Sequence, residues 1–224
     1  MTSTASTAGT AGTAGTAGTA STASTAAGIL LAAGAGRRMG APKALLAWGD
    51  GLLVDRAARL LTDGGCAPVL VVLGCQAEEV RRRARLGAAT ALDAPGWERG
   101  MGTSLRAGLA AAAASPAGAA VVALVDQPRI GASAVRRLID AWHAGAVAAV
   151  ATYDGQPRNP VLLDRSVWPE VAALADGDVG ARGWLRAHRE RVTAVVCDGT
   201  GDPTDVDTRA DYDALVALDI LETA

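Results

Sequence analysis

Lys43 is the only lysine of the 224-residue chain, which otherwise carries its positive charge on twenty arginines. It ends a Gly-rich stretch, GAGRRMGAPK, that also contains Arg37 and Arg38. Glycines in such a loop let backbone N–H groups approach a phosphate closely, and the three cationic side chains supply positive charge. A compact ammonium on a flexible stem can follow a phosphoryl group whose charge moves during a reaction. The stretch therefore predicts a polyphosphate site in which Lys43 has a specific role.

The glycine spacing differs from both common nucleotide-binding motifs. A dinucleotide fingerprint needs G-x-G-x-x-G, whereas Gly34, Gly36 and Gly40 are spaced one residue too widely, and the second apolar run ends on Gly74 rather than on an acidic residue. A Walker A motif needs Ser or Thr directly after its lysine, but alanine follows Lys43. Both motifs therefore fit the chain poorly.

Two aspartates are candidate metal ligands. Asp126 ends the most apolar run, AAVVALVD, where a carboxylate can hold Mg²⁺ against phosphates; the alternative is a helix-capping or turn residue. Asp207 also has two interpretations, because Thr208 and Asp211 form the capping box T-x-x-D of the last predicted helix, and a carboxylate there can simply oppose the helix dipole. Asp205 is the alternative second ligand.

Short apolar runs alternate with amphipathic patterns after residue 27. The runs cover residues 28–33, 68–74, 119–126 and 146–153. Uninterrupted hydrophobicity predicts strands buried on both faces, and apolar spacings of three and four between them predict helices that cover a sheet. The alternation predicts one α/β domain, residues 28–224, with a doubly wound, mostly parallel sheet. Ligands bind such sheets at the carboxyl ends of the strands, where the Gly-rich loop and Asp126 are expected.

Composition limits the remaining possibilities. Residues 1–27 contain only Met, Thr, Ser, Ala and Gly, so we expect a disordered tail without the basic residues of a targeting signal. A net charge of −2 with dispersed basic residues argues against nucleic-acid binding, and no run is apolar enough to span a membrane. Three cysteines without a C-x-x-C spacing argue against a disulfide framework or a zinc site and favour the cytoplasm.

The stretch LAAGAGRRMGAPKALL, residues 31–46, resembles the signature of MobA-like nucleotidyltransferases, which include molybdenum cofactor cytidylyltransferase and guanylyltransferase. Further matches follow in the order of that family: GWERGMGTSLRAGL (96–109), LVDQPRI (124–130), RNPVLL (158–163), GDVGAR (177–182) and DVDTRADYDAL (205–215). The resemblance implies a Rossmann-like fold of the nucleotide-diphospho-sugar transferase type. It also implies transfer of a nucleotidyl group from a nucleoside triphosphate to an acceptor phosphate, with release of pyrophosphate.

The resemblance also suggests a role for individual positions. It places nucleotide binding at Leu31, Ala32, Ala33, Gly34, Gly36, Lys43, Asp93 and Ser104. It places Mg²⁺ at Asp126 and Asp207, and a phosphorylated pterin-type acceptor at Arg158, Asn159, Asp178 and Arg182. Relatives often have His where this chain has Asn159. From the residues alone, a helix-capping role for Ser104 is about as well supported as nucleotide contact. The same holds for Asp178 with Gly180, which could cap the following helix instead of binding the acceptor.

The sequence LAAG rather than LAGG resembles the cytidylyl branch, because Ala33 replaces a glycine that helps to admit guanine. CTP is therefore the expected donor and GTP the second choice, with a molybdoenzyme or a chaperone as the protein partner. We expect Lys43, with Arg37 or Arg38, to neutralise the triphosphate while the two carboxylates hold Mg²⁺. Two alternatives remain: an NAD(P)H-dependent oxidoreductase of the same family, and a non-catalytic cofactor-binding module. The dinucleotide spacing argues against the first, and the retained lysine and carboxylates argue against the second.

Overall fold

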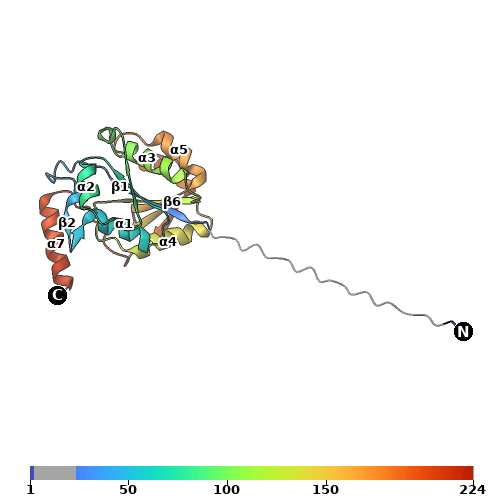
Figure 1. The fold of residues 1–224 in the computed structure, drawn as a ribbon. Helices are drawn as coiled ribbons and strands as arrows, with labels where there is room; N and C mark the ends of the chain where they lie inside the picture. Colours follow the sequence, from blue (N-terminus) through green and yellow to red (C-terminus); the bar gives the residue numbers. More distant parts are fainter. Residues whose placement is uncertain (3–23, 224) are drawn as a thin grey trace.

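The described residues form a central sheet of seven strands in the order β5-β4-β1-β6-β8-β7-β9 (Figure 1). The structure is a computed structural model that describes residues 1–2 and 24–223. The strands of this sheet are β1 (Ala26–Ala32), β4 (Val69–Leu73), β5 (Thr90–Asp93), β6 (Ala119–Leu124), β7 (Ala148–Tyr153), β8 (Gln156–Asp164) and β9 (Val192–Val196). Only β8 runs antiparallel to its neighbours, so the carboxyl ends of the other described strands meet at one edge.

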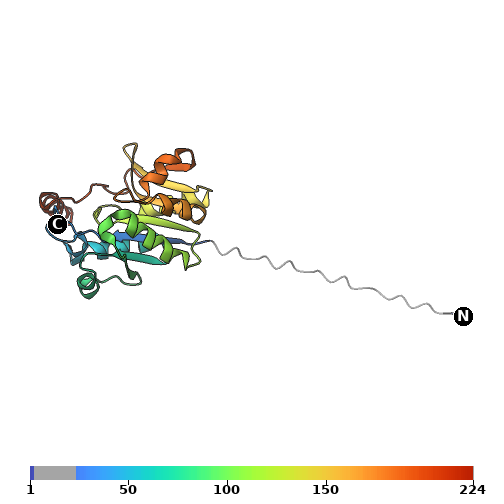
Figure 2. The same cartoon turned by 90° about the horizontal axis from the view of Figure 1, so that it is seen from above.

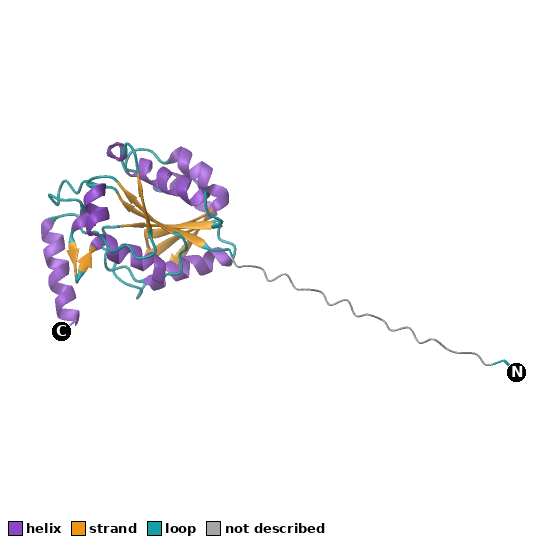
Figure 3. Cartoon of the chain, in the orientation of Figure 1, coloured by secondary structure: helices purple, strands orange, loops and turns teal. Residues whose placement is uncertain are grey.

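Helices cover both faces of the sheet (Figure 3). They are α1 (Leu53–Asp63), α2 (Ala77–Arg83), α3 (Met101–Ala113), α4 (Ala132–His143), α5 (Trp168–Leu174), α6 (Arg182–Ala187) and α7 (Arg209–Thr223). Single 3₁₀ turns are η1 (Lys43–Leu45), η2 (Trp97–Arg99), η3 (Arg165–Val167) and η4 (Arg189–Arg191), and β2 (Ala47–Trp48) pairs with β3 (Gly51–Leu52) in a separate hairpin. In Figures 1 and 2, α7 lies at the end of the molecule away from the start of β1.

Alternate side chains of β1 enter two different hydrophobic cores. Ile29 and Leu31 pack with α3, α5 and α6, whereas Leu30 and Ala32 pack with α1 and α4 on the other face. This follows from the two-residue period of a strand, which directs successive side chains to opposite faces. Both cores are continuous under the helices, which explains why the runs of this sheet are apolar throughout. The predicted doubly wound, mostly parallel α/β fold is confirmed.

The direction in which strands are added to the sheet reverses at β1. The chain places β4 and β5 on one side of β1 and then returns to place β6 on the other. At such a switch point, the loops that leave the two central strands diverge and open a crevice at the carboxyl edge of the sheet. The Gly-rich loop leaves β1 there, and Asp126 follows β6 by two residues. The topology therefore brings both candidate motifs to the same place.

Strand β1 begins two residues before the predicted boundary at residue 28. Ala26 and Ala27 are buried and pair with the first residues of β6, and the carbonyl of Thr25 accepts a hydrogen bond of 2.9 Å from Gly118. Alanine is common to the tail and the strand, so composition does not mark this boundary. The remainder of the predicted tail, residues 3–23, lies outside the described residues.

Two deletions test this boundary. We expect removal of residues 2–23 to leave the melting temperature unchanged, because that segment contains no bulky apolar side chain that could pack. Extending the deletion through residue 27 should lower the melting temperature, since it removes buried residues and ladder hydrogen bonds from the central strand. Thermal unfolding of both variants beside the full chain makes the comparison. A lower melting temperature after the shorter deletion would show that the tail packs on the domain.

Among the described residues, no helix has both the length and the hydrophobicity that a membrane span needs.

The arginine run at residues 81–85 is partly neutralised, because Arg81 pairs with Asp93 and with Glu78, and two further arginines of the run pair with Glu79. The run therefore does not form a bare basic patch.

Candidate active site

A pocket of about 570 Å³ opens at the carboxyl edge of the sheet, where β1 and β6 end. Its volume lies within the range of small-molecule sites. It gathers most of the residues predicted from the sequence, namely Leu31, Ala33, Gly34, Gly36, Arg37, Arg38, Lys43, Ser104, Asp126, Asp178, Arg182 and Asp207. Asp205 lines it as well.

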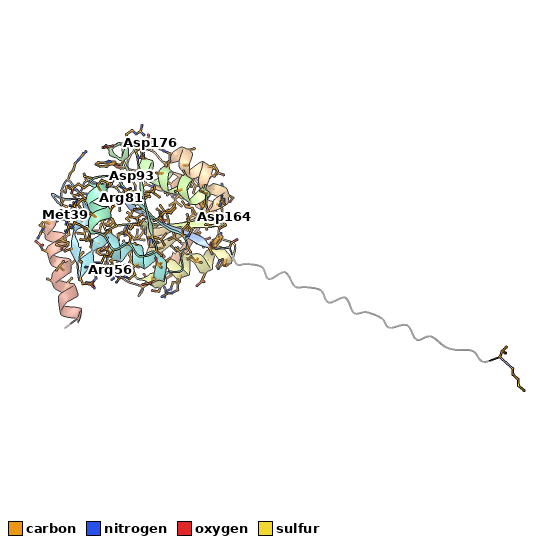
Figure 4. All side chains as sticks on the ribbon, in the orientation of Figure 1. Met39, Arg56, Arg81, Asp93, Asp164 and Asp176 are labelled. Atoms are coloured by element: carbon orange, nitrogen blue, oxygen red, sulfur yellow. The ribbon has the colours of Figure 1, made fainter. Side chains whose placement is uncertain are left out.

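The Gly-rich loop folds back on itself before it reaches Lys43. Gly36 has a φ of +59°, and a Cβ atom there would lie 1.9 Å from the carbonyl oxygen of Ala41, so this position requires glycine. The carbonyl of Gly36 accepts hydrogen bonds from the N–H groups of Met39 and Gly40, both at 2.9 Å. Met39 is buried in the core beneath the loop. Figure 4 labels it at the end of the molecule where α7 lies. This buried anchor leaves the neighbouring arginines exposed.

Lys43 lies between the two predicted metal ligands. Its Nζ donates to Oδ2 of Asp126 at 2.8 Å and to Oδ1 of Asp207 at 2.7 Å, and Arg38 also pairs with Asp207 at 3.0 Å. Burial lowers the pKa of Lys43, but the charge of Asp126 and the hydrogen bonds to both carboxylates outweigh it, and the pKa is raised. The hydrogen bond from Lys43 lowers the pKa of Asp207 despite some desolvation. The ammonium and this carboxylate therefore both stay charged near neutral pH.

The structure separates the two interpretations of Asp207. The start of α7 is capped by its neighbours, because the N–H of Thr208 donates to Oδ2 of Asp211 at 2.7 Å and the N–H of Asp211 donates to the hydroxyl of Thr208 at 3.2 Å. The Asp207 N–H also donates to Asp211, at 3.1 Å. The carboxylate of Asp207 instead points to Lys43. The capping box thus satisfies the helix terminus and leaves Asp207 available for the pocket.

The acidic side of the pocket fits a hard divalent cation. Oδ1 of Asp126 is buried and has no hydrogen-bond partner among the described residues, although its other oxygen contacts Lys43. Burial, and then the negative charges of Asp126 and Asp207, raise the pKa of Asp205, which shows that a third carboxyl group lies near. No complete cage of three or more such ligands exists in the described chain. Mg²⁺ commonly binds through one or two carboxylates, with phosphates and water completing the shell.

The predicted acceptor residues divide into two groups. Asp178 and Arg182 line the pocket, whereas Arg158 and Asn159, on β8, are not part of its lining. Oδ1 of Asp178 accepts a hydrogen bond of 3.3 Å from the N–H of Met101. Asp178 therefore contacts the first residue of α3, and the alternative interpretation of Asp178 as a cap of the helix that begins at Arg182 is wrong, since no side-chain hydrogen bond caps α6.

Three more expectations concern nucleotide binding. Ser104 is buried in the first turn of α3, three residues after the helix begins at Met101, so it is not the N-cap, and its side chain is part of the pocket lining. Ala32 lies in the core on the other face of the sheet, as expected for the neighbour of Leu31 on a strand. Asp93 lies outside the lining and pairs with Arg81 at 2.8 Å (Figure 4).

Sequence reasoning did not single out the aromatic wall of the pocket. Trp97 lines it together with Met101. A Cβ atom at Gly74 would lie 2.5 Å from Cγ of Trp97 and 2.8 Å from Cβ of Ala33, so the indole packs directly on the backbone after β4. Trp97 lies within the matched stretch GWERGMGTSLRAGL, which was the available signal. A flat wall of this kind suits a planar ring.

Comparison with known proteins supports the relation implied by the motifs. Residues 28–192 match the family described as the MobA-like NTP transferase domain. The chain is 40% identical over 189 residues to nicotine blue oxidoreductase of Paenarthrobacter nicotinovorans, which covers 81% of this chain and 91% of that protein.

Solved structures are similar over nearly the whole fold. The crystal structure of Rv0371c from Mycobacterium tuberculosis is 31% identical and covers 88% of this chain and 100% of its own, with a TM-score of 0.77. A structure of Rv0371c in complex with manganese covers 87% of this chain and 99% of its own, at 29% identity and a TM-score of 0.72. The matched region contains the Gly-rich loop, Lys43 and Asp126, and the chain belongs to the MobA-like NTP transferase family of nucleotidyltransferases.

Proposed function

We propose that this protein is a Mg²⁺-dependent cytidylyltransferase, which moves CMP from CTP to a phosphorylated, pterin-type acceptor and releases pyrophosphate. The observation that carries the proposal is the ammonium of Lys43, which lies within 2.8 Å of carboxylate oxygens on both Asp126 and Asp207 in a pocket bordered by a Gly-rich loop. Nucleotidyl transfer needs this combination, because a triphosphate must be neutralised while its α-phosphorus is attacked.

The cationic residues suit the two anionic substrates. Arg37 and Arg38 lie on the Gly-rich loop, next to the position proposed for the triphosphate, and Arg182 lines another part of the same pocket. Within the described chain, neither Arg37 nor Arg182 is paired with a carboxylate, so both guanidinium groups are available to an anion. A guanidinium binds a phosphate through two parallel hydrogen bonds. We assign Arg182 to the acceptor phosphate.

The proposed reaction uses no nucleophile from the protein. An oxygen of the acceptor phosphate attacks the α-phosphorus of CTP, and the bond to the β-phosphate bridging oxygen breaks in line with the attack. Asp126 and Asp207 would hold the metal, and Lys43 neutralises charge on the leaving pyrophosphate. Bound Mg²⁺ would supply positive charge to the phosphates and help to orient them.

An oxidoreductase is the second candidate, since the relative that is 40% identical carries the name nicotine blue oxidoreductase. Dinucleotide folds place the cofactor pyrophosphate at the N-terminus of the helix that directly follows the first strand. Here β1 is followed by the long loop and by the three-residue turn η1, so among the described residues no helix that directly follows β1 presents its N-terminus to this edge. The carboxyl groups of Asp126, Asp205 and Asp207 would also repel a pyrophosphate that reaches them without a metal.

Calorimetric titration distinguishes the two candidates. We expect CTP to bind in a Mg²⁺-dependent manner and more tightly than GTP, because Ala33, which lines the pocket, replaces a glycine that helps to admit guanine in the guanylyl branch. In the variant Ala33→Gly, the preference for CTP should shrink by about 10-fold, the scale for one methyl-sized contact. Tighter binding of NADPH than of any triphosphate would end the transferase proposal and favour the oxidoreductase.

A further inference from the structure

The segment after β6 and the segment before α7 run antiparallel to each other beneath the pocket. The N–H of Asp202 donates to the carbonyl of Arg129 at 3.1 Å, and the N–H of Val206 donates to the carbonyl of Asp126 at 2.8 Å. Among the described residues, no backbone hydrogen bond joins the segments between these two points. Residues 203–205 therefore form a span that the backbone of the first segment does not hold.

The side chain of Gln127 fills this gap. It is buried, with only 4% of its surface exposed, and its Nε2 donates to the carbonyl of Pro203 at 3.1 Å. Burial, and then the charge of Asp126, raise the pKa of Asp205, and the amide of Gln127 lowers that pKa against these larger effects. Its Oε1, by contrast, has no hydrogen-bond partner in the described part of the chain. A buried amide whose oxygen has no hydrogen-bond partner adds little to the stability of the fold. The contribution of Gln127 therefore lies in the loop position that its N–H group fixes.

Asp207 depends on this support from one side only. On its C-terminal side the backbone is fixed by the capping box of α7, whose Asp211 accepts the N–H of Asp207 itself. On its N-terminal side the supports are the Val206 hydrogen bond, the bond from the Thr204 N–H to Oδ1 of Asp202, and the bond from Gln127 to the carbonyl of Pro203. The Asp207 side chain is also more exposed than that of Asp126, at 38% against 21%. Its placement is therefore sensitive to the loop that carries it.

We propose that Gln127 is a positioning residue of the metal site, which holds the 203–205 span so that the carboxylate of Asp207 stays opposite that of Asp126. The proposal rests on the proposed function, because it assumes that the two carboxylates bind a divalent cation. Gln127 touches neither the cation nor the substrates in this proposal and acts only through the loop. Mutation of outer partners that orient metal ligands commonly weakens metal affinity by about 10- to 100-fold.

Titration with Mn²⁺ alone, followed by the electron paramagnetic resonance signal of free Mn²⁺, tests this role without turnover. Gln127→Met keeps the length of the side chain and removes its amide, and we expect it to weaken Mn²⁺ binding by about 10- to 100-fold. Tyr153→Phe is the matched control, because it removes a buried hydroxyl contact of 3.3 Å to Thr200 in the stem of the same segment. It should leave Mn²⁺ affinity within about twofold, whatever its effect on the melting temperature.

The outcomes are distinct. Weaker Mn²⁺ binding in Gln127→Met alone supports the positioning role, whereas equal weakening in both variants, or none in Gln127→Met, overturns it and leaves the transferase proposal standing. Failure of the unaltered protein to bind Mn²⁺ both alone and in the presence of CTP would overturn both proposals. If Gln127→Met does not fold, Gln127→Asn replaces it, since the same amide on a stem one methylene shorter no longer reaches Pro203.

Discussion

Lys43→Ala should lower turnover by at least about 100-fold, the scale for removing one preorganised charged group from a transition state. Affinity for CTP should fall far less, because Arg37, Arg38 and the loop N–H groups still bind the triphosphate. Lys43→Arg keeps the charge but replaces a compact ammonium with a planar fork, so we expect it to stay well below the unaltered protein. Single-turnover rates and calorimetric CTP binding for the two variants separate the two effects. Full activity of Lys43→Arg would reduce this lysine to a source of general positive potential.

The contacts of Lys43 predict that its removal strengthens metal binding, which is opposite to its effect on turnover. Its ammonium shares one oxygen of Asp126 and one of Asp207, so a cation that binds the same carboxylates without nucleotide competes with it. We therefore expect Lys43→Ala to bind Mn²⁺ alone more tightly than the unaltered protein does, although its turnover is lower. Weaker Mn²⁺ binding in this variant would show that the lysine organises the carboxylates and does not compete for them.

Asp126→Asn should lower turnover by a similar or larger factor while the protein stays folded. The carboxylate is the proposed anchor of the metal, and its unpartnered buried oxygen contributes little to the stability of the fold. Asp207→Asn should act in the same direction. Turnover at saturating Mg²⁺, Mn²⁺ affinity and melting temperature would be measured for each variant.

Asp211→Asn is the matched control for Asp207→Asn. It weakens the cap on α7, where Asp211 accepts N–H hydrogen bonds from Asp207 and Thr208, but it does not line the pocket. We expect it to lower the melting temperature and to lower turnover far less than Asp207→Asn does, because the carboxylate of Asp207 is retained. Should Asp207→Asn instead retain activity and lose only thermal stability, the carboxylate would be part of the helix cap and not a metal ligand.

The parallel strands β1, β4, β6 and β7, unlike the partly exposed edge strand β9, could be predicted because they are buried on both faces. Their apolar runs are visible without any long-range information, and the topology then places the Gly-rich loop and Asp126 at one edge. Strand β8 was not predicted, since Pro157, Arg158 and Pro160 interrupt its amino-terminal half. Only the apolar half, which pairs with β6, carries a strand signal.

The candidate site could be predicted for residues that the sequence places next to the carboxyl ends of the strands. Lys43, Asp126 and Asp207 meet in the structure, whereas Ala32 lies on the opposite face of β1. Neighbouring residues of a motif on a strand point to opposite faces of the sheet, and a motif match does not show which face each side chain takes. Gln127 gave no signal of its own, because its importance depends on a span that is distant in the sequence and adjacent only in the fold.

The central claim is nucleotidyl transfer with CTP as donor, and pyrophosphate release measures it most directly. The purified protein would be incubated with Mg²⁺, each of the four nucleoside triphosphates in turn and a phosphorylated pterin, with Asp126→Asn as the inactive control. The account predicts one pyrophosphate released for each CTP consumed, less with GTP, and none without the acceptor. No pyrophosphate from any triphosphate, together with oxidation of NADPH by the same preparation, would contradict it.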